Sequence, residues 1–213
     1  MGKRFLIFKT TRELQEHFSN DTIFLENKSI LYIHISSRLK RNINFVGKII
    51  INDKNVIGNN CELHNVVIGS SNTIKNSSLI SNSELKSFNS IGPFSYIRDK
   101  TYIGNNNLIG AHTELTRTSI KNDNKLSHFS FVGDTEIGMN NIIGAGVVTA
   151  NYKSKKINKL KTKILSNCFI GSNSTLIAPC KINSGSIIGA GSTINFDVKK
   201  NQKVIQKRVN KEY

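Results

Sequence analysis

The sequence lacks several features that would place it in a membrane or outside the cell. It has no uninterrupted apolar run of eighteen residues, so we expect no membrane span. The apolar stretch within residues 4–8 is too short for the core of a secretory signal peptide. The three cysteines, Cys61, Cys168 and Cys180, are odd in number and show no CxxC spacing, which favours reduced thiols over disulfides. Together these absences predict a cytoplasmic location.

Acidic residues are scarce as well. Fourteen Asp and Glu stand against thirty Lys and Arg, which gives a formal net charge of +16. The excess is densest over residues 153–163 and 199–211. A nucleic acid, a polyphosphate ligand such as coenzyme A, or a merely solvated surface would each suit these lysines. No aromatic residues are interleaved with them to stack on bases, and no nucleic-acid motif occurs, so we expect no nucleic-acid partner.

What the sequence does contain is an aliphatic residue at every sixth position, a period that fits neither a helix nor a simple strand. A β-sandwich would instead show a period of two. The repeat occupies these positions: Ile91, Ile97, Ile103, Ile109 and Leu115, then Ile137 and Ile143, then Ile164, Ile170, Leu176, Ile182, Ile188 and Ile194. Six residues supply one short strand and one turn, and three such units close a triangular coil of about 18 residues. The period predicts an all-β fold, a parallel β-helix of hexapeptide repeats.

Residues 1–44 do not carry this repeat. Thr10 and Glu13 form a capping box that predicts a short helix near residues 14–18, after a strand at residues 4–9. We expect residues 1–44 to form a small α/β cap over the exposed first coil.

Residues 45–198 are predicted to form the β-helix. Within them the six-residue pattern is lost over residues 151–163, which predicts a loop extruded from the column. Residues 199–213 are predicted to form a basic C-terminal tail.

Histidine is the residue type most suited to acid–base chemistry here. Of the five histidines, His112 and His128 lie sixteen residues apart, close to the length of one coil. A shared metal site is therefore a weak alternative, because structural and catalytic metals usually take three or four ligands. We expect no metal site.

Several motifs, in order, resemble the acetyltransferase half of the bacterial bifunctional enzyme that makes UDP-N-acetylglucosamine, a hexapeptide-repeat acyltransferase. The resemblance covers about residues 91–198. It is carried by the segments IGPFSYIR at 91–98, SHFSFVGDTEIG at 127–138, NIIGAG at 141–146, Asn151-Tyr152, KLKT at 159–162, FIGS at 169–172 and IAP at 177–179.

The resemblance implies a left-handed β-helix that works as a homotrimer, with ligands held in clefts between columns. It assigns the general base to His128, the sugar-phosphate contact to Arg98 and a position near the reacting amine to Glu114. An imidazole suits the role of general base, because the amine must lose a proton as it attacks a thioester. The acetyl-CoA contacts implied by the family fall on Ala145, Asn151, Tyr152, Lys159, Ser172, Ala190 and Lys207.

Three polar positions of the family's sugar pocket differ in this sequence. A lysine is replaced by Thr116, which Arg117 follows, a tyrosine by Phe131 and an asparagine by Ile142. Losing paired polar contacts changes acceptor discrimination strongly, so we expect an amino sugar other than glucosamine 1-phosphate, either another sugar phosphate or a nucleotide-linked sugar.

The sequence thus predicts an acetyl-CoA-dependent N-acetyltransferase that acts on an amino sugar and needs no metal for acetyl transfer. Two alternatives stay open. One is a sugar O-acetyltransferase of the same fold, and the other is a non-catalytic hexapeptide scaffold.

Overall fold

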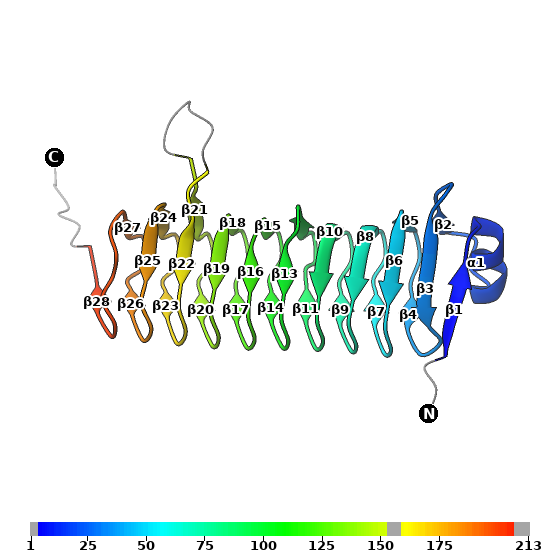
Figure 1. The fold of residues 1–213 in the computed structure, drawn as a ribbon, viewed down its shortest axis with the longest axis horizontal. Coiled ribbons are helices and arrows are strands. Elements are labelled where there is room, and N and C mark those ends of the chain that lie inside the picture. Colours follow the sequence, from blue (N-terminus) through cyan, green and yellow to red (C-terminus); the bar gives the residue numbers. More distant parts are fainter. Residues whose placement is uncertain (1–3, 153–158, 207–213) are drawn as a thin grey trace, which may run out of the picture.

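Short strands and regular corners build a three-sided column (Figure 1). In the computed structural model, which describes residues 4–152 and 159–206, ten coils stack along one axis. Every described strand except the first pairs in parallel with a strand one coil away. Faces one and two join into one sheet because β8 and β10 run across the corner between them, and face three is a separate sheet.

The strands fall on the three faces in chain order. Face one holds β2 (Ile23–Leu25), β5 (Ile43–Val46), the first halves of β8 (Glu62–Ile68) and β10 (Leu79–Leu85), β12 (Tyr96–Arg98), β15 (Glu114–Thr116), β18 (Phe131–Gly133), β21 (Val148–Ala150), β24 (Thr175–Ile177) and β27 (Thr193–Ile194). Face two holds β3 (Ile30–His34), β6 (Lys48–Ile51), the second halves of β8 and β10, β13 (Tyr102–Ile103), β16 (Ser119–Ile120), β19 (Thr135–Ile137), β22 (Thr162–Ile164) and β25 (Cys180–Ile182). Face three holds β4 (Arg38–Leu39), β7 (Val56–Ile57), β9 (Thr73–Ile74), β11 (Ser90–Ile91), β14 (Leu108–Ile109), β17 (Lys125–Leu126), β20 (Ile142–Ile143), β23 (Phe169–Ile170), β26 (Ile187–Ile188) and β28 (Lys203–Val204).

The core is a set of aliphatic stacks that run along the column. Ile91 pairs with Ile109 in the next coil, and Ile109 pairs with Leu126 in the one after. All the residues that set the six-residue period are at most 2% exposed. Each coil thereby removes apolar surface from water at three points, worth about 25 cal/mol per Å². The predicted fold class is confirmed: the chain is a left-handed parallel β-helix, and its described residues include one α-helix.

A row of buried asparagines connects neighbouring coils by hydrogen bonds. Its members each lie just before a strand of face three: Asn55, Asn72, Asn89, Asn107, Asn124 and Asn141. The Asn124 amide donates to Asn107 Oδ1 at 3.1 Å, and the Asn141 amide donates to Asn124 Oδ1 at 2.9 Å. Because these polar groups are inaccessible to water, their partners must come from neighbouring coils.

The coils begin earlier than the boundary at residue 44 that the sequence predicts. β2, β3 and β4 already form a coil, since they pair in parallel with β5, β6 and β7. Outside the coils lie β1 (Phe5–Phe8), antiparallel to β3, and α1 (Thr11–Phe18), which begins at the predicted capping box. Leu14 of α1 is fully buried, so this part packs onto the first coil.

The predicted insertion leaves the column between β21 and β22. The amide of Leu160 donates to the carbonyl of Asn151 at 2.9 Å and closes the base of this segment. Residues 153–158 in the predicted loop lie outside the described residues.

The predicted C-terminal tail starts as part of the column. Its strand β28 pairs with β26 and continues face three, while residues 207–213 lie outside the described residues.

The three cysteines are unpaired and buried inside the column. Burial raises the pKa of each thiol, because a thiolate loses its hydration there. Among the described residues, no helix combines the length and apolarity that crossing a membrane requires.

Candidate active site

Face one is bordered by two corners, and the predicted site residues divide between them. We call the corner between faces three and one the His128 corner, and the corner between faces one and two the arginine corner.

The His128 corner places four predicted residues in one row, one coil apart: His128, Ala145, Ser172 and Ala190. The register of β17, β20, β23 and β26 aligns them, and the carbonyls of His128, Ala145 and Ser172 each accept a backbone hydrogen bond from the following coil. The His128 side chain is exposed. The predicted base and three predicted coenzyme residues therefore share one edge of face one.

Close approach of the backbones explains the glycines that precede this row. A Cβ on Gly144 would lie 2.5 Å from the Ser172 nitrogen, and one on Gly171 would lie 2.3 Å from the Ala190 nitrogen. A shallow depression follows at the end of the row, lined by Ser172, Asn173, Ala190, Gly191 and Gln206. A long, thin ligand can lie along the part of this corner beyond His128, because the side chains of Ala145, Ser172 and Ala190 are small.

Three exposed rings stack beside His128, and this stack was not predicted from the sequence. Phe94, His112 and Phe129 lie parallel, with centroids 4.9 and 5.1 Å apart, and His128 meets the Phe129 ring edge-on at 5.9 Å. Phe94, His112 and Phe129 are eighteen and seventeen residues apart, about the length of one coil, and this spacing is the sequence signal for the stack. Because His112 lies between two phenyl rings, it has a packing role in the structure. No group of three or more metal-ligating side chains occurs within the described residues.

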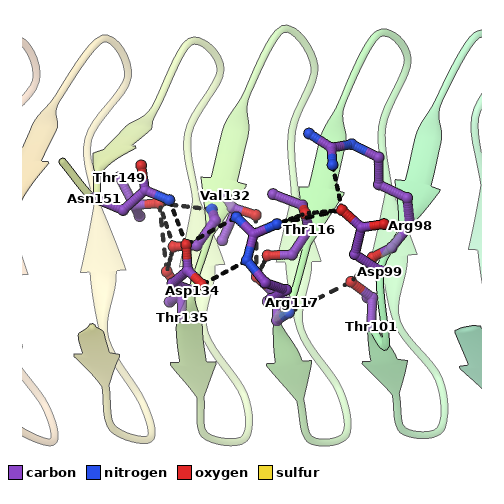
Figure 2. A network of polar contacts seen from close by, with 12 residues as sticks. Arg98, Asp99, Thr101, Thr116, Arg117, Val132, Asp134, Thr135, Thr149 and Asn151 are labelled. Atoms are coloured by element: carbon purple, nitrogen blue, oxygen red, sulfur yellow. Dashed lines mark hydrogen bonds and ion pairs between the residues drawn. The ribbon is translucent and has the colours of Figure 1, made fainter. Parts of the chain in front are cut away.

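The arginine corner holds a continuous network of polar contacts across four coils, and its ion pairs join three of them (Figure 2). Asp99, Arg117 and Asp134 occupy the same corner position in successive coils, each with a left-handed backbone of φ 50–55°. Stacked corners bring their side chains into contact although seventeen or eighteen residues separate them. Arg117 donates to both carboxylate oxygens of Asp134, at 2.7 and 2.9 Å. Arg98 donates twice to Glu114, at 3.0 and 2.7 Å, and also to Asp99.

These contacts shift the pKa values of the charged groups. Burial raises the pKa of Asp134, but hydrogen bonds from Arg117 and Asn151 outweigh it, so the net shift is downward. The hydrogen bond to Asp134 raises the pKa of Arg117. Burial lowers the pKa of Arg98, but contact with Glu114 and Asp99 reverses the effect and raises it.

Several predicted ligand contacts are already used inside the protein. Thr116 is fully buried, and its hydroxyl donates to Asp99 at 3.1 Å and accepts from Arg117 at 2.8 Å. Asn151 is 3% exposed and its amide donates to Asp134. These two residues therefore serve the ionic network in the structure.

Phe131 and two other predicted contacts also lie near this corner. Phe131 lies across Gly133, where an added Cβ would be 3.0 Å from the ring and 2.8 Å from the Asn151 amide. Tyr152 is 62% exposed, and the Lys159 ammonium lies 5.4 Å from its ring centroid. Both residues belong to the described ends of the insertion.

Two predicted residues stand apart from these groups. Ile142 points outward from face three, 47% exposed, so one column does not bring it to the face-one residues. Lys207 lies outside the described residues. Asp99 and Asp134 were not predicted as site residues, because an aspartate at a turn also has a purely local role in binding the backbone. Their one-coil spacing from Arg117 is the only sequence signal for the pairing.

Comparison with known proteins supports the class that the β-helix and its corner residues indicate, the hexapeptide-repeat transferases. The family description "Bacterial transferase hexapeptide (six repeats)" matches residues 161–195. Over these residues the chain is similar to the hexapeptide-repeat transferases.

Among curated relatives, the chain is similar to proteins named Bifunctional protein GlmU. The one from Wigglesworthia glossinidia brevipalpis is 42% identical over 166 residues, 78% of this chain and 36% of the relative. The one from Thermotoga maritima is 34% identical over 199 residues, 88% of this chain and 42% of the relative. The chain thus spans well under half the length of these relatives, and the resemblance predicted from the motifs is confirmed.

A solved structure supports the fold. The UDP-N-acetylglucosamine acyltransferase of Francisella novicida is 21% identical with a TM-score of 0.54, over 76% of this chain and 62% of that one. At this identity the likeness concerns the fold alone.

Proposed function

We propose that this protein transfers an acetyl group from acetyl-CoA to the amine of an amino sugar, with His128 as the general base. The observation that carries the proposal is the row of His128, Ala145, Ser172 and Ala190 along one corner, in a chain that is 42% identical to a GlmU protein over 166 residues. Small residues leave the corner open for a coenzyme, and the row puts the imidazole at its end.

The reaction needs one base and one donor. His128 takes a proton from the amine of the sugar while the amine nitrogen forms a bond to the thioester carbon. The carbon–sulfur bond breaks, and the departing thiolate receives that proton from the imidazolium. The oxyanion formed between these steps requires a hydrogen-bond donor. The amide nitrogen of Asn151 already donates to Asp134, which favours a backbone N–H for this role.

An assembly of three columns would complete the site. Face three carries exposed aliphatic and aromatic side chains in register on successive coils: Leu108, Ile142, Phe169 and Ile187, which are 42–47% exposed. Lys125 interrupts this stripe between Leu108 and Ile142. Contact with neighbouring copies would bury the stripe and bring Ile142 of one subunit toward face one of the next.

The test is turnover with a panel of acceptors. Free thiol release from acetyl-CoA is followed with amino sugars, with their hydroxyl analogues and with no acceptor, and the products are identified by mass. Amino-sugar-dependent thiol release with an amide product supports the proposal. Ester products would instead indicate an O-acetyltransferase, and no saturable acetyl-CoA binding would indicate a non-catalytic scaffold.

A further inference from the structure

We infer that Asp99 closes the arginine corner to phosphate, so that the acceptor presents an uncharged part there. This inference rests on the proposed transfer to an amino sugar and names the class of that acceptor. The resemblance assigns a sugar phosphate to Arg98, whereas the contacts of this chain satisfy that arginine internally.

Both guanidinium groups at the corner have every nitrogen engaged. In Arg98, Nε and Nη2 donate to Glu114 and Nη1 donates to Asp99. In Arg117, Nε and Nη2 donate to Asp134, and Nη1 donates to Asp99 at 3.3 Å and to Thr116. A phosphate needs the forked donors of a guanidinium, and here carboxylates already occupy them.

Charge disfavours an added anion as well. The two arginines face three carboxylates, those of Asp99, Glu114 and Asp134, and Lys159 at the end of the insertion supplies one further cation near Asp134. Lys100 is a further, exposed cation of this corner, between β12 and β13. The two guanidinium groups themselves are outnumbered by carboxylates, and a phosphate dianion bound to them would be placed beside these negative groups.

Asp99 is the residue that joins the two arginines. Its Oδ2 accepts from Arg98, from Arg117 and from the Thr116 hydroxyl. The left-handed backbone at residue 99, with φ 55°, fixes this carboxylate on the corner between them. It acts as an internal anion in the place where the family pattern expects a substrate phosphate.

The surroundings suit a neutral sugar instead. Tyr96 is 41% exposed, and its ring centroid lies 5.4 Å from the Arg98 guanidinium carbon. Phe131 lies on the same face one coil beyond Glu114. These rings offer apolar surface to one side of a sugar, while outward lone pairs of the carboxylates accept hydroxyl protons. The acceptor class is an amino sugar without phosphate at this end.

The experiment compares the wild type with Asp99→Asn, which removes the charge and keeps the size. Asp123→Asn is the matched control, because Asp123 is also a left-handed corner residue, but among the described contacts its carboxylate accepts a hydrogen bond only from Asn106. Inorganic phosphate binding is measured by calorimetry at constant ionic strength and millimolar concentration. In parallel, thiol release is measured with glucosamine and with glucosamine 1-phosphate.

The wild type should show no saturable phosphate binding and should prefer glucosamine. Asp99→Asn should gain phosphate binding and shift the preference toward the phosphorylated sugar by about tenfold, and Asp123→Asn should do neither. Saturable wild-type binding that Arg98→Met abolishes would overturn the inference, as would an Asp99→Asn variant indistinguishable from Asp123→Asn. If neither sugar is acetylated, the proposed function is in error for these acceptors, and the phosphate measurement still decides the role of Asp99.

Discussion

At the scale of single residues, the corner aspartates hold together coils that are remote in sequence. The Asp134 side chain is 11% exposed and receives two hydrogen bonds from Arg117 and one from Asn151. Removing one partner from such a partly buried pair leaves the other charge without compensation, which costs more than the pair contributes in isolation.

Asp134→Asn should therefore lower the free energy of unfolding by about 2 kcal/mol at pH 7. Because the pKa of Asp134 is lowered in the folded state, its stabilising contribution is present above the ordinary Asp pKa of about 3.9. The contribution is lost as the pH falls through the lowered value. Urea titrations from pH 7 to pH 3 should show the difference from wild type shrinking at the acid end. A difference that grows on acidification would contradict the assigned contacts.

At the scale of the element, each coil depends on the register with its neighbours. The asparagine row shows this most clearly, because Asn124 donates to Asn107 and accepts from Asn141, bridging three coils. Its side chain is fully buried, so no water replaces a lost partner.

Asn124→Ala should cost about 2–3 kcal/mol of stability, because buried groups on both adjacent coils lose a partner. Asn105→Ala is the control, since Asn105 is exposed and water can replace its side-chain contacts to Ser87 and Asn122. Thermal unfolding of the two variants measures the contrast. Equal small losses of stability in both variants would show that the asparagine row contributes little to the stability of the column.

How far the sequence predicts these elements depends on how strictly a coil follows the six-residue period. From Ile91 onward the inward residues recur at that period apart from five-residue steps into Ile120 and out of Val132. The strands, the insertion site and the stacking of His128 with Ala145 follow from this period. The first coil was missed because β3 is five residues long, so Leu31 and Ile33 alternate as in an ordinary strand. The pairing of Arg117 with Asp99 and Asp134 was missed because it depends on which corner of the coil each residue occupies.

At the scale of the whole molecule, the column exposes on face three an apolar stripe that a single copy leaves in water. Ile142 and Phe169 are adjacent partners there, 47% and 46% exposed. Association through this face would remove that surface and place one copy's face three beside another's site.

Ile142→Glu should convert the proposed trimer to smaller species at micromolar concentration and reduce acetyl transfer with it. Light scattering after size exclusion gives the mass. Ser119→Glu, at an exposed position of face two, controls for the added charge and should leave the mass unchanged. A wild type that is monomeric, or an Ile142→Glu variant of unaltered mass, would argue against assembly through face three.

The most direct test is the turnover of His128→Ala beside that of His34→Ala, which removes a histidine of β3 in the first coil, away from the proposed site. With acetyl-CoA and the best amino-sugar acceptor, loss of the base should lower kcat by about 10²–10⁴ while the melting temperature stays that of wild type. His34→Ala should retain full turnover. Wild-type rates in a folded His128→Ala protein would contradict the assignment of His128 as the general base.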